Sequence, residues 1–167
     1  MPVRAAGSDP RARVLRWLAR RDRSERELRE RLAAWGVPAG EGEAILDELR
    51  GRGLMDDAAL AERIRDWHCR HDPVGPRGLR ERLRRRGLPD DLAAAACAPL
   101  RDGEFQRELA DAVLRRRLPA LRGLDPLRRR RRLAAHLERR GFDGAVIHDA
   151  LAGLDDGGAG AEDETAC

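Results

Sequence analysis

The sequence predicts an all-α protein built from three tandem three-helix, helix-turn-helix-like repeats. Composition is the first observation behind this prediction. Ala and Leu account for 50 of the 167 residues, whereas Val, Ile, Thr and the aromatic residues together account for 15. This ratio favours helices and argues against a β-sandwich or barrel. The other two observations are apolar residues at helical spacing and a sequence frame that occurs three times.

The first three helices are bounded by recognisable caps. Val14 and Leu18 mark a helix over residues 10–21. Ser24 and Glu27 then form the S-x-x-E pattern of a capping box, which satisfies two free amide donors at the start of a second helix. Gly36 ends that helix as a left-handed residue. Apolar residues from 44 to 49 line a third helix, which we expect to end near Gly53.

Three further helices are expected between residues 56 and 98. Asp56 and Asp57 open a fourth helix, where acidic side chains complement the helix dipole. The proline-containing segment 72–76 ends it, and its last residue suits the first turn of a fifth helix, which ends at Gly87. A short Ala-rich sixth helix follows over residues 90–98, up to a proline.

The last three helices follow the same spacing rule. A seventh is expected over residues 103–117, and an eighth begins near Asp125 and carries Leu133 and Leu137 on its buried face. A ninth is expected over residues 143–152.

One frame, Leu-x-x-x-Leu-x-x-x-Gly-apolar, occurs in the middle helix of each group of three. The copies are 51 and 54 residues apart and read Leu28-Leu32-Gly36-Val37, Leu79-Leu83-Gly87-Leu88 and Leu133-Leu137-Gly141-Phe142. Stacked repeats of this kind predict an elongated, curved, modular protein. The expected segments are a flexible leader, 1–9, three repeat units, 10–54, 55–100 and 101–152, and a disordered acidic tail, 153–167.

Charge indicates an anionic partner. All 34 basic residues are Arg, and the formal net charge is +4. Five acids and no base lie in residues 153–167, so the first 152 residues carry +9. A basic body suits nucleic acid or an acidic protein surface. The alternative is a solvated Arg/Glu surface with no binding role, and the absence of Lys is typical of a GC-rich genome.

Arginine clusters are the candidate contact residues, since guanidinium groups bind phosphates and carboxylates bidentately. Arg130 lies on the stripe of Leu133 and Leu137, so we expect its stem to pack there. The candidates are Arg84, Arg85, Arg86, Arg115, Arg116, Arg117, Arg128, Arg129, Arg132 and Arg139. The alternative is that these arginines only compensate helix dipoles.

Other functions find little support. The five aromatic residues, Trp17, Trp35, Trp67, Phe105 and Phe142, occupy apolar-face positions and are predicted to be core. Any DNA contact should therefore be electrostatic and independent of sequence. The segment His68-Cys69-x-His71-Asp72 lacks a second ligand pair, so no metal is expected. No catalytic constellation or phosphate-binding loop is present, and we expect no cofactor.

Location and assembly are inferred more indirectly. Three scattered cysteines suggest a reducing cytoplasm. No run of apolar residues is long enough to span a membrane, and the first residues lack the apolar core of a signal peptide. We expect a cytoplasmic monomer.

The sequence resembles the RecX family, the regulators of the RecA recombinase. The resemblance is carried by Leu15-x-x-Leu18-Ala19-Arg20-Arg21, Gly53-Leu54-Met55-Asp56-Asp57, Gly75-Pro76-Arg77-Gly78-Leu79 and Arg139-Arg140-Gly141-Phe142, in the family's order. The motif residues to which a structural role is assigned are Ser24, Glu27, Leu28, Leu32, Gly53, Leu54, Asp56, Asp57, Gly75, Pro76, Gly87, Gly141 and Phe142. Gly42 departs from the family pattern, which has an apolar side chain there.

The resemblance implies a non-catalytic protein that binds the RecA filament on single-stranded DNA. It implies inhibition of ATP hydrolysis, filament extension and strand exchange, and hence a role in DNA repair, homologous recombination and the SOS response. Single-stranded DNA, and duplex DNA without sequence specificity, are the implied nucleic-acid partners. One alternative is a helix-turn-helix-like basic protein that acts directly on DNA without RecA. Another is an adaptor that binds an unrelated acidic protein.

Overall fold

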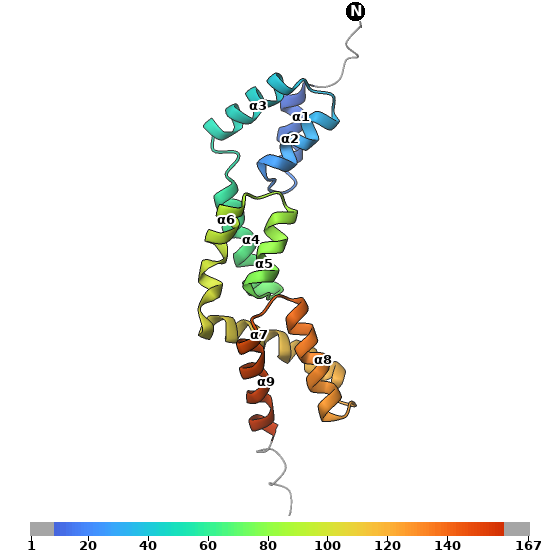
Figure 1. Ribbon diagram of the computed structural model, residues 1–167. Helices are drawn as coiled ribbons and strands as arrows, with labels where there is room; N and C mark the ends of the chain where they lie inside the picture. Colours follow the sequence, from blue (N-terminus) through green and yellow to red (C-terminus); the bar gives the residue numbers. More distant parts are fainter. Residues whose placement is uncertain (1–8, 159–167) are drawn as a thin grey trace, which may run out of the picture. The chain divides into compact units, whose positions relative to one another are not determined.

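Helices make up the regular secondary structure of the computed structural model, which describes residues 9–158 (Figure 1). No strand occurs within that range, so the all-α prediction is confirmed. The α-helices are α1, Pro10–Leu18; α2, Glu25–Ala34; α3, Ala39–Gly51; α4, Asp57–His71; α5, Pro76–Arg85; α6, Asp90–Cys97; α7, Gly103–Arg117; α8, Pro126–Arg139; and α9, Gly144–Gly158. Two 3₁₀ helices, η1, Ala98–Arg101, and η2, Leu118–Leu121, flank α7. No described helix is long and apolar enough to cross a membrane.

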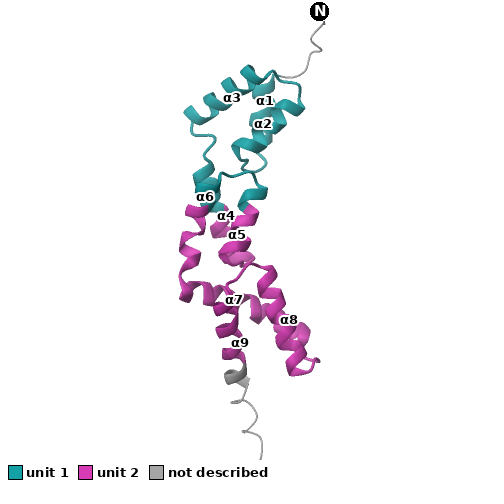
Figure 2. Cartoon of the chain, viewed as in Figure 1, with its two compact units in different colours: residues 1–63, 83–93 teal, residues 64–82, 94–167 magenta. Residues whose placement is uncertain are grey.

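The chain divides into two compact units (Figure 2). Unit 1 comprises Met1–Arg63 and Leu83–Ala93, and unit 2 comprises Ile64–Arg82 and Ala94–Cys167. Helices α4, α5 and α6 each contribute residues to both units.

Two helix boundaries differ from the sequence prediction. Helix α1 ends at Leu18 rather than at residue 21, because the chain must turn before Ser24 can cap α2. Helix α9 continues past residue 152 to Gly158, so the prediction of disorder from residue 153 is wrong up to that point. The rest of the predicted tail, and residues 1–8 of the predicted leader, lie outside the described residues.

Side-chain caps begin several helices where the sequence predicted them. Ser24 accepts a hydrogen bond from the Glu27 amide, and the Glu27 carboxylate accepts one from the Ser24 amide, so the capping box is confirmed. Asp56 caps α4 by accepting from the amide of Ala59 at 2.9 Å. Asp125 caps α8 in the same way. These caps satisfy amide groups that have no partner within their own helices.

The three middle helices, α2, α5 and α8, end in the same hydrogen-bonded turn. The frame glycines Gly36, Gly87 and Gly141 have φ between 75° and 79°, a backbone conformation that side chains with a Cβ rarely adopt. Each glycine amide bonds the carbonyl three residues earlier, and each following amide bonds the frame's second leucine. This is the Schellman motif. The frame leucines of all three helices are at most 2% exposed. In each middle helix the repeated frame therefore marks two buried leucines followed by a glycine that ends the helix.

Both units also contain the same junction between successive middle helices. In unit 1, Ser24 Oγ, at the start of α2, donates to the carbonyl of Arg86, at the end of α5. In unit 2, the amide of Gly75, just before α5, donates to the carbonyl of Arg140, at the end of α8. Each arginine donates back to a carbonyl two residues before its partner: Arg86 to Asp22 at 2.9 Å, and Arg140 to Pro73 at 2.8 Å.

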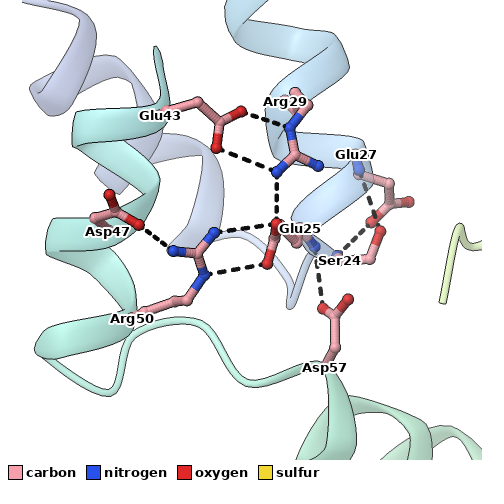
Figure 3. Close-up of polar contacts among 8 residues, drawn as sticks. All are labelled: Ser24, Glu25, Glu27, Arg29, Glu43, Asp47, Arg50 and Asp57. Atoms are coloured by element: carbon pink, nitrogen blue, oxygen red, sulfur yellow. Dashed lines mark hydrogen bonds and ion pairs between the residues drawn. The ribbon is translucent and has the colours of Figure 1, made fainter. Parts of the chain in front are cut away.

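A network of ions joins α2 to α3 in unit 1 (Figure 3). The Glu25 carboxylate accepts hydrogen bonds from Arg29 at 2.5 Å and from Arg50 at 3.1 Å, and it lies between the two guanidinium groups. The Glu25 amide donates to Asp57 at 3.0 Å. Hydrogen bonds from Arg50 and Arg29 hold the pKa of Glu25 below its usual value, so it stays ionised. Arg29 also donates to the Glu43 carboxylate, and Arg50 also donates to the Asp47 carboxylate.

Each unit has its own apolar core. In unit 1, buried residues of α1, α2 and α3 cluster together: Val14, Leu28, Leu32, Ile45, Leu46 and Leu49, with Met55. In unit 2, α9 packs against α7 and α8, and its Val146 and Ile147 are buried, as is Phe142.

The prediction that all five aromatic residues are core is only partly confirmed. Phe142 is fully buried, whereas Trp17, Trp35 and Phe105 are half-buried. Trp67 is 53% exposed, so the prediction is wrong for this residue. Burial in α4 is concentrated at Leu60 and Ala61, near its start. The Trp67 ring packs instead on the histidine rings of its own helix, 4.9 Å from His68 and 5.5 Å from His71.

Candidate functional site: a basic surface of unit 2

Helix α8 presents a row of exposed arginines. Each helical residue advances the direction of its side chain by about 100°, so Arg128, Arg132 and Arg139 fall within about 40° of one another. They point away from the buried stripe of Leu133 and Leu137. Their side chains make no hydrogen bond or ion pair within the described part of the chain. We call these three residues the α8 arginine row.

Two of the neighbouring arginines of α8 are less available, whereas a third, Arg131, is exposed but points about 60° round the helix from Arg128. Arg130 is half-buried and donates to the carbonyl of Leu151 at 3.4 Å, as its position on the apolar stripe predicted. Arg129 is also half-buried, although the sequence predicted it to be exposed. It lies about 100° round the helix from Arg128, nearer the apolar stripe. The α8 arginine row is therefore a better candidate contact than the complete run of five arginines.

Further positively charged side chains line a small cleft beside the α8 arginine row. Its volume is about 200 Å³, and it is lined by Asp72, Pro73, Val113, Arg116, Arg117, His136 and Arg140. Three guanidinium groups therefore face one carboxylate. Arg116 donates to the carbonyl of His71 at 2.6 Å, which ties the end of α7 to the end of α4. We call this the His136 cleft.

Arg140 forms hydrogen bonds with several groups in and beside the His136 cleft. Its guanidinium donates to Asp72 at 2.6 Å, to the Pro73 carbonyl, and to His136 Nε2 at 3.2 Å. Burial alone would raise the pKa of Asp72, but the hydrogen bond and charge of Arg140 outweigh it and hold this pKa below its usual value. Because His136 Nε2 accepts a hydrogen bond, the ring is neutral and carries its proton on Nδ1.

Of the predicted contact residues, the structure brings Arg116 and Arg117 of α7 together with Arg139 of α8 around His136. Arg115 is exposed at the end of α7. His136 and Arg140 were not predicted as site residues. Both lie beside the apolar stripe of α8, where a polar side chain reaches the rim of a packed interface, and this position is the signal that could have identified them.

The arginines at the end of α5, in unit 1, differ in their surroundings. Arg84 lies 3.6 Å from the Asp90 carboxylate, and Arg85 is exposed. Arg86 donates to Glu27 at 3.0 Å and to the Asp22 carbonyl, and its carbonyl accepts from Ser24. Arg86 uses its Nε and one terminal nitrogen for the junction inside unit 1, so its contact with a partner stays a prediction.

The pH dependence of His136 gives a first prediction. Burial lowers its pKa, and the charges of Arg140, Arg117 and Arg139 lower it further. As pH falls below about 6.5, the unfolded chain takes up this proton before the folded one does. The contribution of His136 to stability is therefore complete above about pH 6.5 and declines as pH falls towards the folded-state pKa. We expect an NMR titration of the His136 imidazole to show this lowered pKa.

A phosphate group in the His136 cleft should reverse that effect, because a nearby anion favours the imidazolium form. Adding a short oligothymidylate is expected to raise the pKa of His136, and Arg117→Ala should raise it in the free protein. A pKa at or above 6.5 in the free protein would contradict the electrostatics described for the cleft.

These observations define a class of protein: an all-α chain of tandem three-helix repeats with a basic surface. Comparison with known proteins narrows that class. Residues 11–49 match the family model described as "RecX, first three-helix domain", and residues 104–151 match "RecX, third three-helix domain". The regulatory protein RecX of Prosthecochloris aestuarii is 34% identical over 139 residues, which cover 83% of this chain and 89% of that protein. That of Stenotrophomonas maltophilia is 36% identical over 141 residues, 84% of each chain.

Solved structures agree with this assignment. A crystal structure of regulatory protein RecX superposes with a TM-score of 0.76 at 26% identity, covering 86% of this chain and 71% of that one. The structure of RecX from Lactobacillus salivarius, at 18% identity and a TM-score of 0.75, shares the fold. The chain belongs to the RecX family. Its relatives are named as regulatory proteins.

Proposed function

We propose that this chain is a non-catalytic, cytoplasmic regulator that binds the RecA filament on single-stranded DNA. Bound there, it inhibits ATP hydrolysis, filament extension and strand exchange, and so modulates DNA repair and recombination. Membership of the RecX family and the resemblance in motifs support RecA as the partner. The observation that carries the proposal is the α8 arginine row, three exposed cations without an ion-pair partner in the described chain.

The chemistry of this surface fits a filament of protein and DNA. A polynucleotide offers phosphates and a protein offers carboxylates, and a guanidinium group binds both through paired hydrogen bonds. Single exposed ion pairs contribute less than about 1 kcal/mol each. Several weak contacts on successive repeats of one chain, however, bind a periodic partner much more tightly than one contact does. A modular protein with arginines on more than one helix is suited to that mode of binding.

The test is RecA-catalysed ATP hydrolysis on single-stranded DNA, with the protein added after the filaments have formed. The wild type should inhibit at less than one molecule per RecA, below the concentration that coats bare DNA. In the variant Arg128→Ala/Arg132→Ala/Arg139→Ala, we expect the half-inhibitory concentration to rise about tenfold, which corresponds to about 1.4 kcal/mol.

A control variant with the same loss of charge separates this surface from net charge. Arg11, Arg52 and Arg63 are exposed arginines of unit 1 that already pair with carboxylates. Arg11→Ala/Arg52→Ala/Arg63→Ala should inhibit nearly as well as the wild type. Equal weakening by both variants would count against the α8 arginine row as the contact. Absence of inhibition by the wild type, with bare-DNA binding intact, would favour direct action on DNA.

A further inference from the structure

Unit 1 contains a second concentration of positive charge, around two tryptophans. Trp17 of α1 and Trp35, the residue that follows α2, meet edge to face, with 6.4 Å between their ring centroids. The Arg13 guanidinium lies 4.0 Å from the Trp35 ring centroid, and that of Arg23 lies 4.0 Å from the Trp17 ring centroid. Arg31 also lies over Trp17, 4.9 Å from its ring centroid. Both tryptophans are half-buried, and both line a cleft at the surface.

A cleft of about 230 Å³ opens beside these rings. Three arginines and two tryptophans line it, with no acidic residue: Arg13, Arg16, Trp17, Arg20 and Trp35. We call it the Arg–Trp cleft. Arg13 and Arg16 lie three positions apart on one side of α1, and Arg20 lies in the turn that follows the helix. Arg20 makes no hydrogen bond or ion pair within the described chain.

The two acidic residues across Trp17 from the Arg–Trp cleft are engaged by other arginines. Glu27 and Glu30 lie across Trp17, in a neighbouring hollow. Glu27 is bound by Arg21 and Arg86, and Glu30 is 3.3 Å from Arg26. In the same hollow, the Nε of Arg23 is buried without a hydrogen-bond partner. Arginines therefore outnumber acidic residues among the side chains that line the Arg–Trp cleft, and one guanidinium nitrogen in the neighbouring hollow has no acceptor.

We propose that the Arg–Trp cleft is a binding site for single-stranded DNA, in which Arg16 and Arg20 hold backbone phosphates beside the indole rings of Trp17 and Trp35. Guanidinium groups match phosphate geometry, and an aromatic surface beside them suits an unpaired base, which can stack on it whatever its identity. An acidic peptide would use the charge but not the rings. Cation–π packing accounts for Arg13 and Arg23 as structural residues, but not for Arg20.

This site extends the proposed function, because it assigns a direct DNA contact to unit 1 that does not require RecA. The two tryptophans make the site observable. In the full-length Trp67→Phe variant, which removes the exposed tryptophan of α4, Trp17 and Trp35 are the only remaining indoles. We expect a short oligothymidylate to quench their fluorescence.

Adding Arg16→Ala/Arg20→Ala to this background should weaken binding at least about fivefold. It should also reduce the slope of log K against log salt by about 1.4, since each phosphate contact on a single strand contributes about 0.7. The matched control is Arg52→Ala/Arg63→Ala, two exposed arginines of the same unit, each paired with a carboxylate. This control should change the affinity for oligothymidylate and the slope of log K against log salt much less.

Three results would overturn the site: no quenching by DNA, equal weakening by the two double variants, or equal quenching by a poly-glutamate peptide. Inhibition of RecA-catalysed ATP hydrolysis, measured with the same variants, separates this inference from the proposed function. Inhibition that persists without quenching overturns only the Arg–Trp cleft. Quenching that depends on Arg16 and Arg20, in a protein that does not inhibit RecA, supports the cleft and overturns only the proposed function.

Discussion

Gly78→Ala is expected to destabilise the protein by about 2 kcal/mol, although alanine is the better helix former. Gly78 lies in the first turn of α5, where helix propensity alone would favour alanine by about 1 kcal/mol. A Cβ at this position, however, would fall on the backbone carbonyl of Arg140, which accepts a hydrogen bond from Gly75. Overpacking against rigid backbone costs about 1–3 kcal/mol, and the loss of the hydrogen bond adds about 1 kcal/mol.

Gly42→Ala is the matched control and should have the opposite sign. Gly42 also lies inside a helix, α3, and is buried. A Cβ there would meet Leu32 Cδ1 at 3.9 Å, an ordinary van der Waals contact. We expect this change to stabilise the protein by about 1 kcal/mol. Urea denaturation of both variants measures the difference. A stabilising Gly78→Ala would show that α5 and the end of α8 are not in contact in solution.

The adjacent residues Arg139 and Arg140 are expected to separate binding from stability. Arg140→Ala should lower the free energy of unfolding by about 2 kcal/mol, because charge-assisted hydrogen bonds to Asp72 and to a backbone carbonyl are lost. The pKa of Asp72 should rise towards its usual value, since Arg140 holds it down. Denaturant unfolding and an NMR titration of the Asp72 carboxyl measure the two effects.

Arg139→Ala removes the same charge from the next residue along α8. The Arg139 side chain is exposed and has no hydrogen bond within the described chain, so stability should change by less than about 0.5 kcal/mol. Inhibition of RecA should weaken instead. If Arg139→Ala unfolds the protein as readily as Arg140→Ala, the distinction between a contact residue and a junction residue is wrong.

Local sequence signals predicted most of the helices. The capping box at Ser24 and Glu27, the Asp caps and the frame glycines depend on groups within a few residues of one another, so the sequence displays them directly. The two boundary errors, at the ends of α1 and α9, arose where no cap marks the helix end. The exposure of Trp67 could not be predicted, because helical spacing shows which residues share a face but not how far a covering element extends.

The sequence predicted the residues of the candidate site less completely than it predicted the helices. Ten arginines were predicted as contacts, but the sequence cannot show which of them have a carboxylate or a carbonyl within reach. Arg86 binds Glu27, 59 positions away, whereas Arg132 is exposed and has no ion-pair partner in the described part of the chain. The Arg–Trp cleft was missed because Trp17 and Trp35 were assigned to the core by their spacing.

The sequence by itself determined the all-α class, the tandem frame and the family of this protein. The class and the frame depend on periodicity and short-range hydrogen bonding, which are local properties of the chain, and the family was recognised from motifs whose residues stand in the family's order. Only the tertiary structure decided which glycines lie against backbone, as Gly78 does and Gly42 does not, and which arginines are neutralised. The physical reason is that steric overlap and ion pairing act over a few ångströms in space, between residues that are far apart in the chain.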